Sequence, residues 1–181
     1  MIRPNRFALG ALLSLAGFAL ASTGAGAASD TATLLGVSSA WSAFTSGSGG
    51  SKICYAISKP ISTTPKAKRD PIYFLITDWP GRTPRTKSEP EVVPGYQYKD
   101  GSTVTAAVGS DKFEMFTKNE DNAGAAWVRQ RADEVKLIEA MRHGQQLLIT
   151  GTSKRGKLTR DTYSLAGLGD ALDKIHASCG M

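Results

Sequence analysis

Histidine and cysteine are scarce in this chain, which removes several kinds of catalytic and metal site. Its 181 residues include two histidines and two cysteines. No HExxH segment or paired-histidine spacing occurs, so the sequence predicts no zinc site and no cofactor. The cysteines, Cys54 and Cys179, form no CxxC pair, which argues against a thioredoxin-like redox centre. The chain also lacks a GxSxG segment, and with it the nucleophile elbow of the α/β-hydrolases.

Long apolar runs are missing as well, since a bilayer crossing needs about 20 apolar residues. The run Phe7–Ala21 has fifteen residues and follows Arg3 and Arg6. Small residues come next and end in an A-x-A site at Ala27. A basic start, a short apolar stretch and such a site are the parts of a secretory signal peptide. We therefore expect residues 1–27 to be a signal peptide and no transmembrane segment to follow. Cleavage after Ala21, an uncleaved anchor and a transit peptide remain open.

Without that leader, 154 of the 181 residues remain, enough for one domain with a hydrophobic core. We expect residues 28–181 to form this single domain. The leader holds two arginines and no acid. Residues 28–181 therefore contain 20 of the 22 basic residues and all 16 acidic residues, which gives a net charge of +4. This charge is too small to indicate a nucleic-acid binder. Contact with anionic lipid, lipopolysaccharide or a host surface fits it, and so does ordinary solubility.

Export also predicts how the two cysteines are used, because oxidising compartments favour disulfides. A bond between Cys54 and Cys179 would enclose 124 residues. Closing a loop of that size stabilises the fold by about 4–5 kcal/mol in the chain-entropy model. Cys179 continues the apolar stripe of a predicted helix, Leu168–Cys179. The bond would therefore tie this helix to the strand that carries Cys54.

Alternating apolar residues between Gly, Pro and Asp turns predict a mainly-β fold. Two short helices are expected, over Ala132–His143 and, at the C-terminus, over Leu168–Cys179. The expected architecture is an antiparallel β-sandwich or a curled sheet. Ser29–Gly36 should be an irregular lead-in, and Lys59–Asp70 and Trp79–Pro90 should be proline-rich loops. Strands are expected over Val37–Thr45, Lys52–Ser58, Pro71–Asp78, Glu91–Tyr98, Thr103–Val108, Lys112–Lys118, Ala125–Arg129, Gln145–Gly151 and Lys157–Leu165.

The two proline-rich loops carry the candidate binding residues, all of them basic. These are Lys66, Lys68 and Arg69 in the first loop, and Arg82, Arg85 and Lys87 in the second. The loops enter and leave one strand, so they should lie at its opposite ends. They are candidates for binding an anionic surface, with ordinary solvated charge as the alternative.

A third basic cluster lies in the segment 151–157, which reads G-x-x-x-x-G-K like the start of a phosphate-binding P-loop. A P-loop needs Ser or Thr next and must open a helix. Leu158 stands there instead, and the residues after it alternate as in a strand. The segment is therefore expected to be a hairpin turn. His143 and His176 lie near helix ends and are expected to be surface residues, and no catalytic residue is predicted.

Within about residues 38–180 the chain contains, in this order, KICYAISKP, IYFLITDWPG, GSTVTAAVGSDKFEMFTKNEDNAGAAW, DEVKLIEAMRHG and GQQLLITGTSKRGKLTRDTYSLAGLGDALDKIHASC. In their order and spacing these segments resemble the invasion-associated locus B family of bacterial envelope proteins. The resemblance implies a periplasmic or surface-exposed β-rich protein, associated in name with host-cell invasion. It implies no enzyme activity, and it carries over only the cysteine pair. The Arg82–Lys87 loop is more basic than the family pattern.

Two functions follow from these observations. The first is an exported, non-catalytic protein of the cell envelope, with an unknown envelope or host-surface component as its partner. The second is a periplasmic hydrolase whose site is assembled only by the fold. A cleft that holds a histidine or acid of shifted pKa would favour the enzyme, and a filled interior would favour the binding protein.

Overall fold

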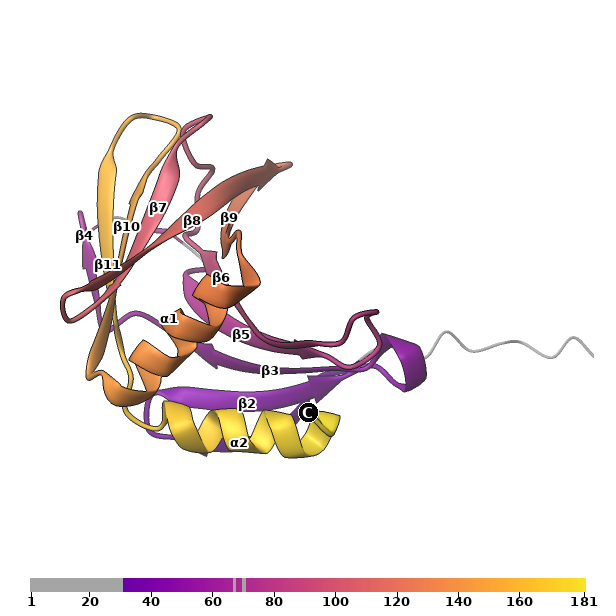
Figure 1. Cartoon of the computed structure of the whole chain (residues 1–181). Coiled ribbons are helices and arrows are strands. Elements are labelled where there is room, and N and C mark those ends of the chain that lie inside the picture. The colour runs from indigo at the N-terminus through magenta and orange to yellow at the C-terminus, as the bar shows by residue number, and fades with distance from the viewer. Residues whose placement is uncertain (1–30, 67, 70) are drawn as a thin grey trace, which may run out of the picture.

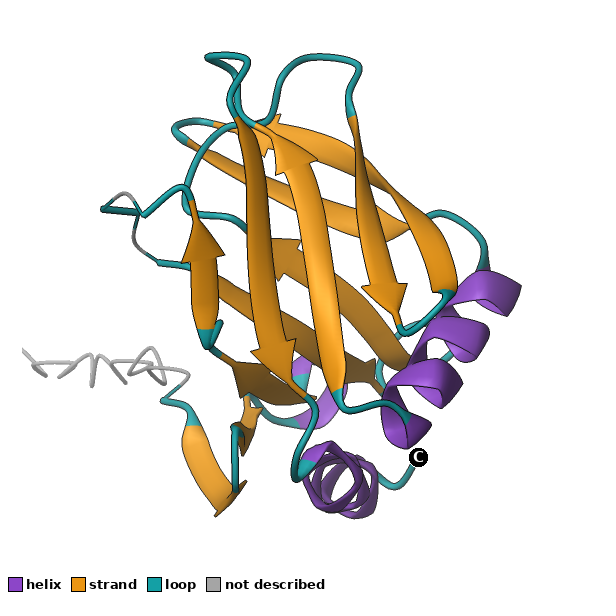
Figure 2. Cartoon of the chain, turned by 90° about the vertical axis from the view of Figure 1, so that its left-hand side faces the viewer, coloured by secondary structure: helices purple, strands orange, loops and turns teal. Residues whose placement is uncertain are grey.

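A computed structural model describes residues 31–66, 68, 69 and 71–181, and the expected signal peptide lies outside them. The described chain is mostly strand, and its strands form one antiparallel sheet that is not closed (Figures 1 and 2). The strands are β1 Thr33–Ser38, β2 Trp41–Ser46, β3 Ile53–Ser58, β4 Ser62–Thr64, β5 Tyr73–Trp79, β6 Thr86–Val93, β7 Thr103–Val108, β8 Asp111–Glu120, β9 Ala123–Val128, β10 Gln146–Thr152 and β11 Leu158–Ser164. The helices are α1 Arg131–His143 and α2 Leu168–Cys179, with a 3-10 turn at Gly49–Ser51.

The sheet runs in the order β1-β2-β3-β5-β6-β9-β8-β7-β10-β11-β4, so β1 and β4 are its free edges. β6 and β9 join its two halves through only two residue pairs, Glu91 with Trp127 and Val92 with Ala126. Because the pairing is so short there, the halves can turn toward each other, and Figure 1 shows the sheet curling at this place. The prediction of a curled antiparallel sheet with a C-terminal helix is confirmed.

The core lies on the concave side of the curl. Trp41 packs edge-on against Phe74, and Phe74 packs in the same way against Tyr163 from the other half of the sheet. All three are fully buried, and the Trp41 indole donates to the Ser164 carbonyl at 3.0 Å. Three aromatic rings from β2, β5 and β11 thus bridge the two halves, and burying rings of this size dominates core energetics.

The two helices cover different parts of the concave side. α2 contacts β1, β2, β3 and β5, while α1 contacts β6, β7, β8, β9 and the side of α2. Leu168, Leu172, Ile175 and Cys179 are buried along the predicted stripe of α2. Within the described residues, neither helix has the length and apolarity needed to cross a bilayer.

Several predicted boundaries are wrong. The expected loop Lys59–Asp70 contains the short strand β4, and the strand expected over Glu91–Tyr98 ends at Val93. Val37–Thr45 is two strands, because Ser39 takes a left-handed φ of 52° and turns the chain between β1 and β2. β1 begins at Thr33, inside the expected lead-in. The loop expected up to Pro90 instead ends at Thr86, where β6 begins. Proline is tolerated there because β9 pairs only with Glu91 and Val92, which leaves the preceding part of β6 as an edge.

Candidate functional site

The first basic loop divides into exposed lysines and a buried arginine. Lys66 and Lys68 are exposed. The Arg69 side chain is only 8% exposed and forms a two-point ion pair with Asp161 of β11. It also donates to the Pro94 carbonyl at 3.0 Å. The Arg69 guanidinium is thus engaged in internal contacts with Asp161 and Pro94, and a role for it at an anionic surface stays a prediction.

The second basic loop is also partly committed to internal contacts. Arg82 pairs with Glu89 at 2.9 Å and lies over the Trp79 ring at 3.9 Å from its centroid. Arg85 donates to the Gly180 carbonyl at the end of α2 at 2.8 Å. Lys87 is exposed, and no hydrogen bond or ion pair of its ammonium is found among the described residues. The two loops flank β5, whose seven residues separate their bases by about 20 Å. They form no single patch.

The P-loop-like segment is a hairpin turn, as predicted. β10 ends at Thr152, β11 begins at Leu158, and the Ser153 amide donates to the Lys157 carbonyl at 2.9 Å. Gly156 closes the turn with a left-handed φ of 76°. Arg155 and Lys157 are exposed at its tip.

The disulfide joins Cys54 of β3 to Cys179 of α2, as predicted, with the two Cα atoms 6.0 Å apart. Cys54 is fully buried and Cys179 is 7% exposed. Their sulfurs are thus sheltered from solvent reductants and serve as a structural link rather than as an accessible redox centre.

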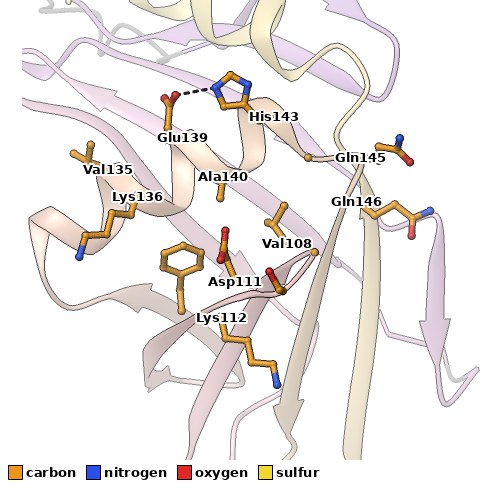
Figure 3. A pocket seen from close by; sticks show the side chains of 14 residues that line it. Val108, Asp111, Lys112, Val135, Lys136, Glu139, Ala140, His143, Gln145 and Gln146 are labelled. Atoms are coloured by element: carbon orange, nitrogen blue, oxygen red, sulfur yellow. Dashed lines mark hydrogen bonds and ion pairs between the residues drawn. The ribbon is translucent and has the colours of Figure 1, made fainter.

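A broad groove runs beside α1 (Figure 3). Its volume is about 1270 Å³, and its walls are α1 and the turn between β7 and β8. Val108, Phe113 and Ala140 give it an apolar lining, while Asp111, Lys112, Lys136 and Glu139 bring charges of both signs to its rim. His143 lies at the end of α1 and contacts Glu139 at 2.8 Å, as Figure 3 shows. Its side chain is 78% exposed, so the prediction of a surface residue is confirmed for His143.

A smaller cleft of about 380 Å³ lies between α1, α2 and β6. Here the prediction for His176 is wrong, because its side chain is only 13% exposed. Its Nε2 lies 2.8 Å from the Ser88 hydroxyl and 3.7 Å from Oδ1 of Asp78. Asp78 is fully buried, and its Oδ1 accepts the Ser88 backbone N–H at 2.8 Å. Three polar residues from β5, β6 and α2 thus form one cluster beneath the cleft.

Burial shifts both titratable members of this cluster toward their neutral forms. It raises the pKa of the Asp78 carboxyl to about 6, although the Ser88 hydrogen bond and the nearby cations Lys87, Arg131 and Arg85 oppose the change. Burial, together with the positive charges of Lys87 and Arg142, lowers the pKa of His176 to about 4. Oδ2 of Asp78 is buried and has no hydrogen-bond partner among the described residues.

This geometry differs from that of a Ser–His–Asp catalytic triad. In a triad the serine contacts Nε2 of the histidine and the carboxylate holds Nδ1 from the other side. Here Ser88 and Asp78 both approach Nε2 of His176, so the carboxylate does not orient the ring for proton transfer from the serine. A histidine of shifted pKa lines the cleft and an acid of shifted pKa lies buried beneath it, which resembles the feature expected of the hydrolase alternative, but without triad geometry. In the described part of the chain, no three His, Cys, Asp or Glu side chains are placed to share a metal ion.

Ser88 itself has an unusual backbone. Its φ is 56°, in the left-handed region that residues other than glycine rarely occupy. It faces a place on β5 where the register shifts between Thr77 and Trp79, leaving Asp78 without a ladder partner on β6. The Asp78 carboxylate holds Ser88 in this conformation by accepting its amide. Sequence periodicity could not show this, because Asp78 and Ser88 meet only through the irregular pairing of two strands.

No protein-family model matches the chain, and no curated protein matches it in sequence. The fold, however, is found in a solved structure, that of invasion associated protein B from Bartonella henselae. The likeness has a TM-score of 0.55, covers 82% of this chain and 99% of that chain, and has 13% sequence identity. The two proteins are therefore structurally related over almost the whole length of the Bartonella protein.

Proposed function

We propose that this chain is an exported protein of the cell envelope, of the invasion-associated locus B type, which binds a partner and catalyses no reaction. The observation that carries this proposal is the fold shared with invasion associated protein B over 99% of that chain. The ordered segments within residues 38–180 that resemble the family add support from the sequence.

The disulfide supports export. Cys54 and Cys179 are bonded across nearly the whole described chain, and such bonds persist mainly in oxidising compartments. A periplasmic location, reached through a signal peptide in residues 1–27, fits this chemistry. Expression of the full chain in a bacterium with a periplasm tests it. We expect the protein in the periplasmic fraction, with its leader removed and both thiols resistant to alkylation. Cytosolic protein with its leader intact and free thiols would contradict the proposal.

The non-catalytic role is supported by the arrangement around His176, which lacks the orientation that a triad requires. A fluorophosphonate probe separates the two functions, because it labels serine nucleophiles that are activated by a base. We expect no labelling of Ser88 in the intact protein. Stoichiometric labelling that disappears in a Ser88→Ala variant would establish the hydrolase instead.

Lys66 and Lys68 are the exposed residues of the first basic loop in the proposed anionic-surface site. Co-sedimentation with vesicles that contain phosphatidylglycerol tests them at low and at physiological salt. The double variant Lys66→Gln/Lys68→Gln should bind more weakly and with a flatter salt dependence. Arg155→Gln/Lys157→Gln removes the same charge from an exposed turn and serves as the matched control. Equal binding by both variants would leave the lysines as ordinary surface charge.

A further inference from the structure

The cleft between α1, α2 and β6 gathers hydrogen-bond donors from three elements that are far apart in the sequence. β6 contributes Lys87 and the Ser88 hydroxyl, α1 contributes Arg131 and Arg142, and α2 contributes His176. Ser88 is 7% exposed, so its hydroxyl sits at the floor of the cleft rather than on the open surface. These groups surround one volume of about 380 Å³.

The basic groups that line the cleft are not all neutralised. Arg131 pairs with Glu134 at 2.6 Å, and Arg142 approaches Asp173 at 3.4 Å. Lys87 has no such partner among the described residues, although its charge acts on both Asp78 and His176. Glu139, the other acid in the lining, pairs with His143 outside the cleft. Lys87 is therefore a cation in reach of the cleft without an anion to bind.

The backbone of Ser88 is a second observation that points to a ligand. A serine with a left-handed φ inside a strand is held against its own preference, and such positions cluster at binding and catalytic sites. Here the conformation places the Ser88 hydroxyl against the imidazole of His176 at 2.8 Å. A hydroxyl and an imidazole side by side, with an unpaired ammonium next to them, are suited to an oxyanion.

We propose that this cleft binds a phosphate group, either as the free ion or as the phosphomonoester of a larger ligand. The inference rests on the proposed binding role and names the chemistry of the ligand. Phosphate fits better than a carboxylate because the donors arrive from three directions, and a tetrahedral oxyanion can accept from all of them. Lys87 and Arg142 would supply charge, the protonated His176 would donate its Nε2–H to the Ser88 oxygen, and the Ser88 hydroxyl would then donate to the phosphate.

Binding of an anion should depend on pH. The charged groups that face His176 are Asp78 from β5, Lys87 from β6, Arg131, Glu139 and Arg142 from α1, and Asp173 from α2. Above pH 6 the ionised Asp78, 3.7 Å from Nε2, opposes an anion beside the imidazole. Below pH 6 Asp78 becomes neutral, and a bound phosphate favours a proton on His176. The phosphate group itself also loses charge in this range, because the second pKa of a phosphomonoester is about 6. For a given charge state of phosphate, binding should therefore strengthen as the pH falls from 7 to 5.

The two histidines allow a direct test by NMR, because His143 is exposed and serves as an internal control. The imidazole resonances of the intact, disulfide-bonded protein are titrated with pH in inorganic phosphate and in chloride of equal ionic strength. We expect phosphate to raise the pKa of His176 by one unit or more, which corresponds to at least tenfold tighter binding to the protonated form. His143 should behave as it does in chloride. Identical titration of His176 in both salts would overturn the proposal.

Variants separate the cleft from general charge. Lys87→Gln and Arg142→Gln should each weaken phosphate binding about tenfold, whereas the exposed Arg155→Gln should leave it unchanged. Lys87 is exposed and its ammonium has no partner within the described part of the chain, so its variant should fold normally. Unchanged affinity in a folded Lys87→Gln protein contradicts the assignment, as does an equal response to acetate at the same ionic strength.

Two further measurements identify the source of the phosphate and isolate the inference. A shift of His176 on phosphatidic acid vesicles, but not on phosphatidylcholine vesicles, would extend the site to a lipid phosphomonoester. A shift with the free ion alone would mark a soluble ligand. Fractionation of the cell is independent of the His176 measurement. A cytosolic protein that still binds phosphate would contradict export and support the phosphate site. An exported protein that does not bind phosphate would support export and contradict the phosphate site.

Discussion

Removing either Asp78 or His176 should change the pH dependence of stability, and the two changes should have opposite signs. The pKa of Asp78 rises from its usual 3.8 to about 6, so folding favours its protonated form. Stability from this group is present below pH 3.8 and is lost as the pH rises through 6. The pKa of His176 falls from 6.5 to about 4, so folding favours its neutral form. Stability from that group is present above pH 6.5 and is lost as the pH falls through 4.

Each shift is a little over two pKa units, which corresponds to roughly 3 kcal/mol as an upper value. Between pH 4 and 6 the two contributions change in opposite directions and nearly cancel in the wild-type protein. Asp78→Asn removes the aspartate contribution, so only the contribution of His176 remains. The free energy of unfolding of this variant should therefore fall relative to wild type, by up to about 3 kcal/mol, as the pH drops from 6.5 to 4. His176→Gln leaves the aspartate, so its relative stability should rise by a similar amount between pH 6 and 4.

Urea unfolding followed by tryptophan fluorescence measures this at half-unit steps from pH 4 to 7.5. Phosphate-free buffers keep ligand binding out of the comparison. Other carboxyl groups contribute equally to all three proteins, so only differences from wild type are interpreted. If both variants follow the wild-type curve at a constant offset, neither group changes its protonation on folding. Slopes of the same sign in both variants would also refute the reasoning.

Three other predictions follow from the disulfide, the buried ion pair and the leader. Reduction, or Cys54→Ala with Cys179→Ala, should lower the free energy of unfolding by about 2–5 kcal/mol, as measured in urea. The amides of α2 should then exchange before those of the sheet, and an unchanged midpoint of urea unfolding would contradict this prediction. Arg69→Met should cost about 3–5 kcal/mol in the same assay because it leaves the Asp161 carboxylate buried without its partner, and a loss below 1 kcal/mol would show that water replaces the guanidinium. Intact-mass analysis of the exported protein should find an N-terminus at Ala28, and retention of residues 1–27 would reject the leader.

The sequence predicted an element correctly where its local sequence pattern agrees with its tertiary contacts. α2 spans Leu168–Cys179 as predicted, because its apolar stripe is regular and glycines with left-handed φ, Gly167 and Gly180, bound it. The hairpin of β10 and β11 was predictable because two strand-like segments flank a glycine turn, and burial alternates along both strands in the structure. The division between β1 and β2 was not predictable, because the turn at Ser39 uses neither glycine nor proline.

The candidate site was less accessible to sequence reasoning because its contacts are long-range. Arg69 looks like a member of an exposed basic loop, and its partner Asp161 lies 92 residues away. His176 is adjacent to the apolar stripe of α2, and its largely buried imidazole lies against Ser88 of β6 and Asp78 of β5. Residue spacing predicts which side chains share one face of a helix, but it does not predict which residues of other elements contact that face.

The last turn of α2 is fixed by several independent contacts, and this separates the stability of the protein from the geometry of the cleft. Besides the disulfide, Arg85 binds the Gly180 carbonyl at 2.8 Å and Lys52 binds the Ser178 carbonyl at 2.5 Å. Cations at these carbonyls also match the negative end of the helix dipole. His176, three residues before Cys179, is held in addition by Ser88. Reduction should therefore lower the melting temperature yet leave the His176 response to phosphate intact below it. Loss of that response in reduced but folded protein would show that the disulfide alone positions the helix.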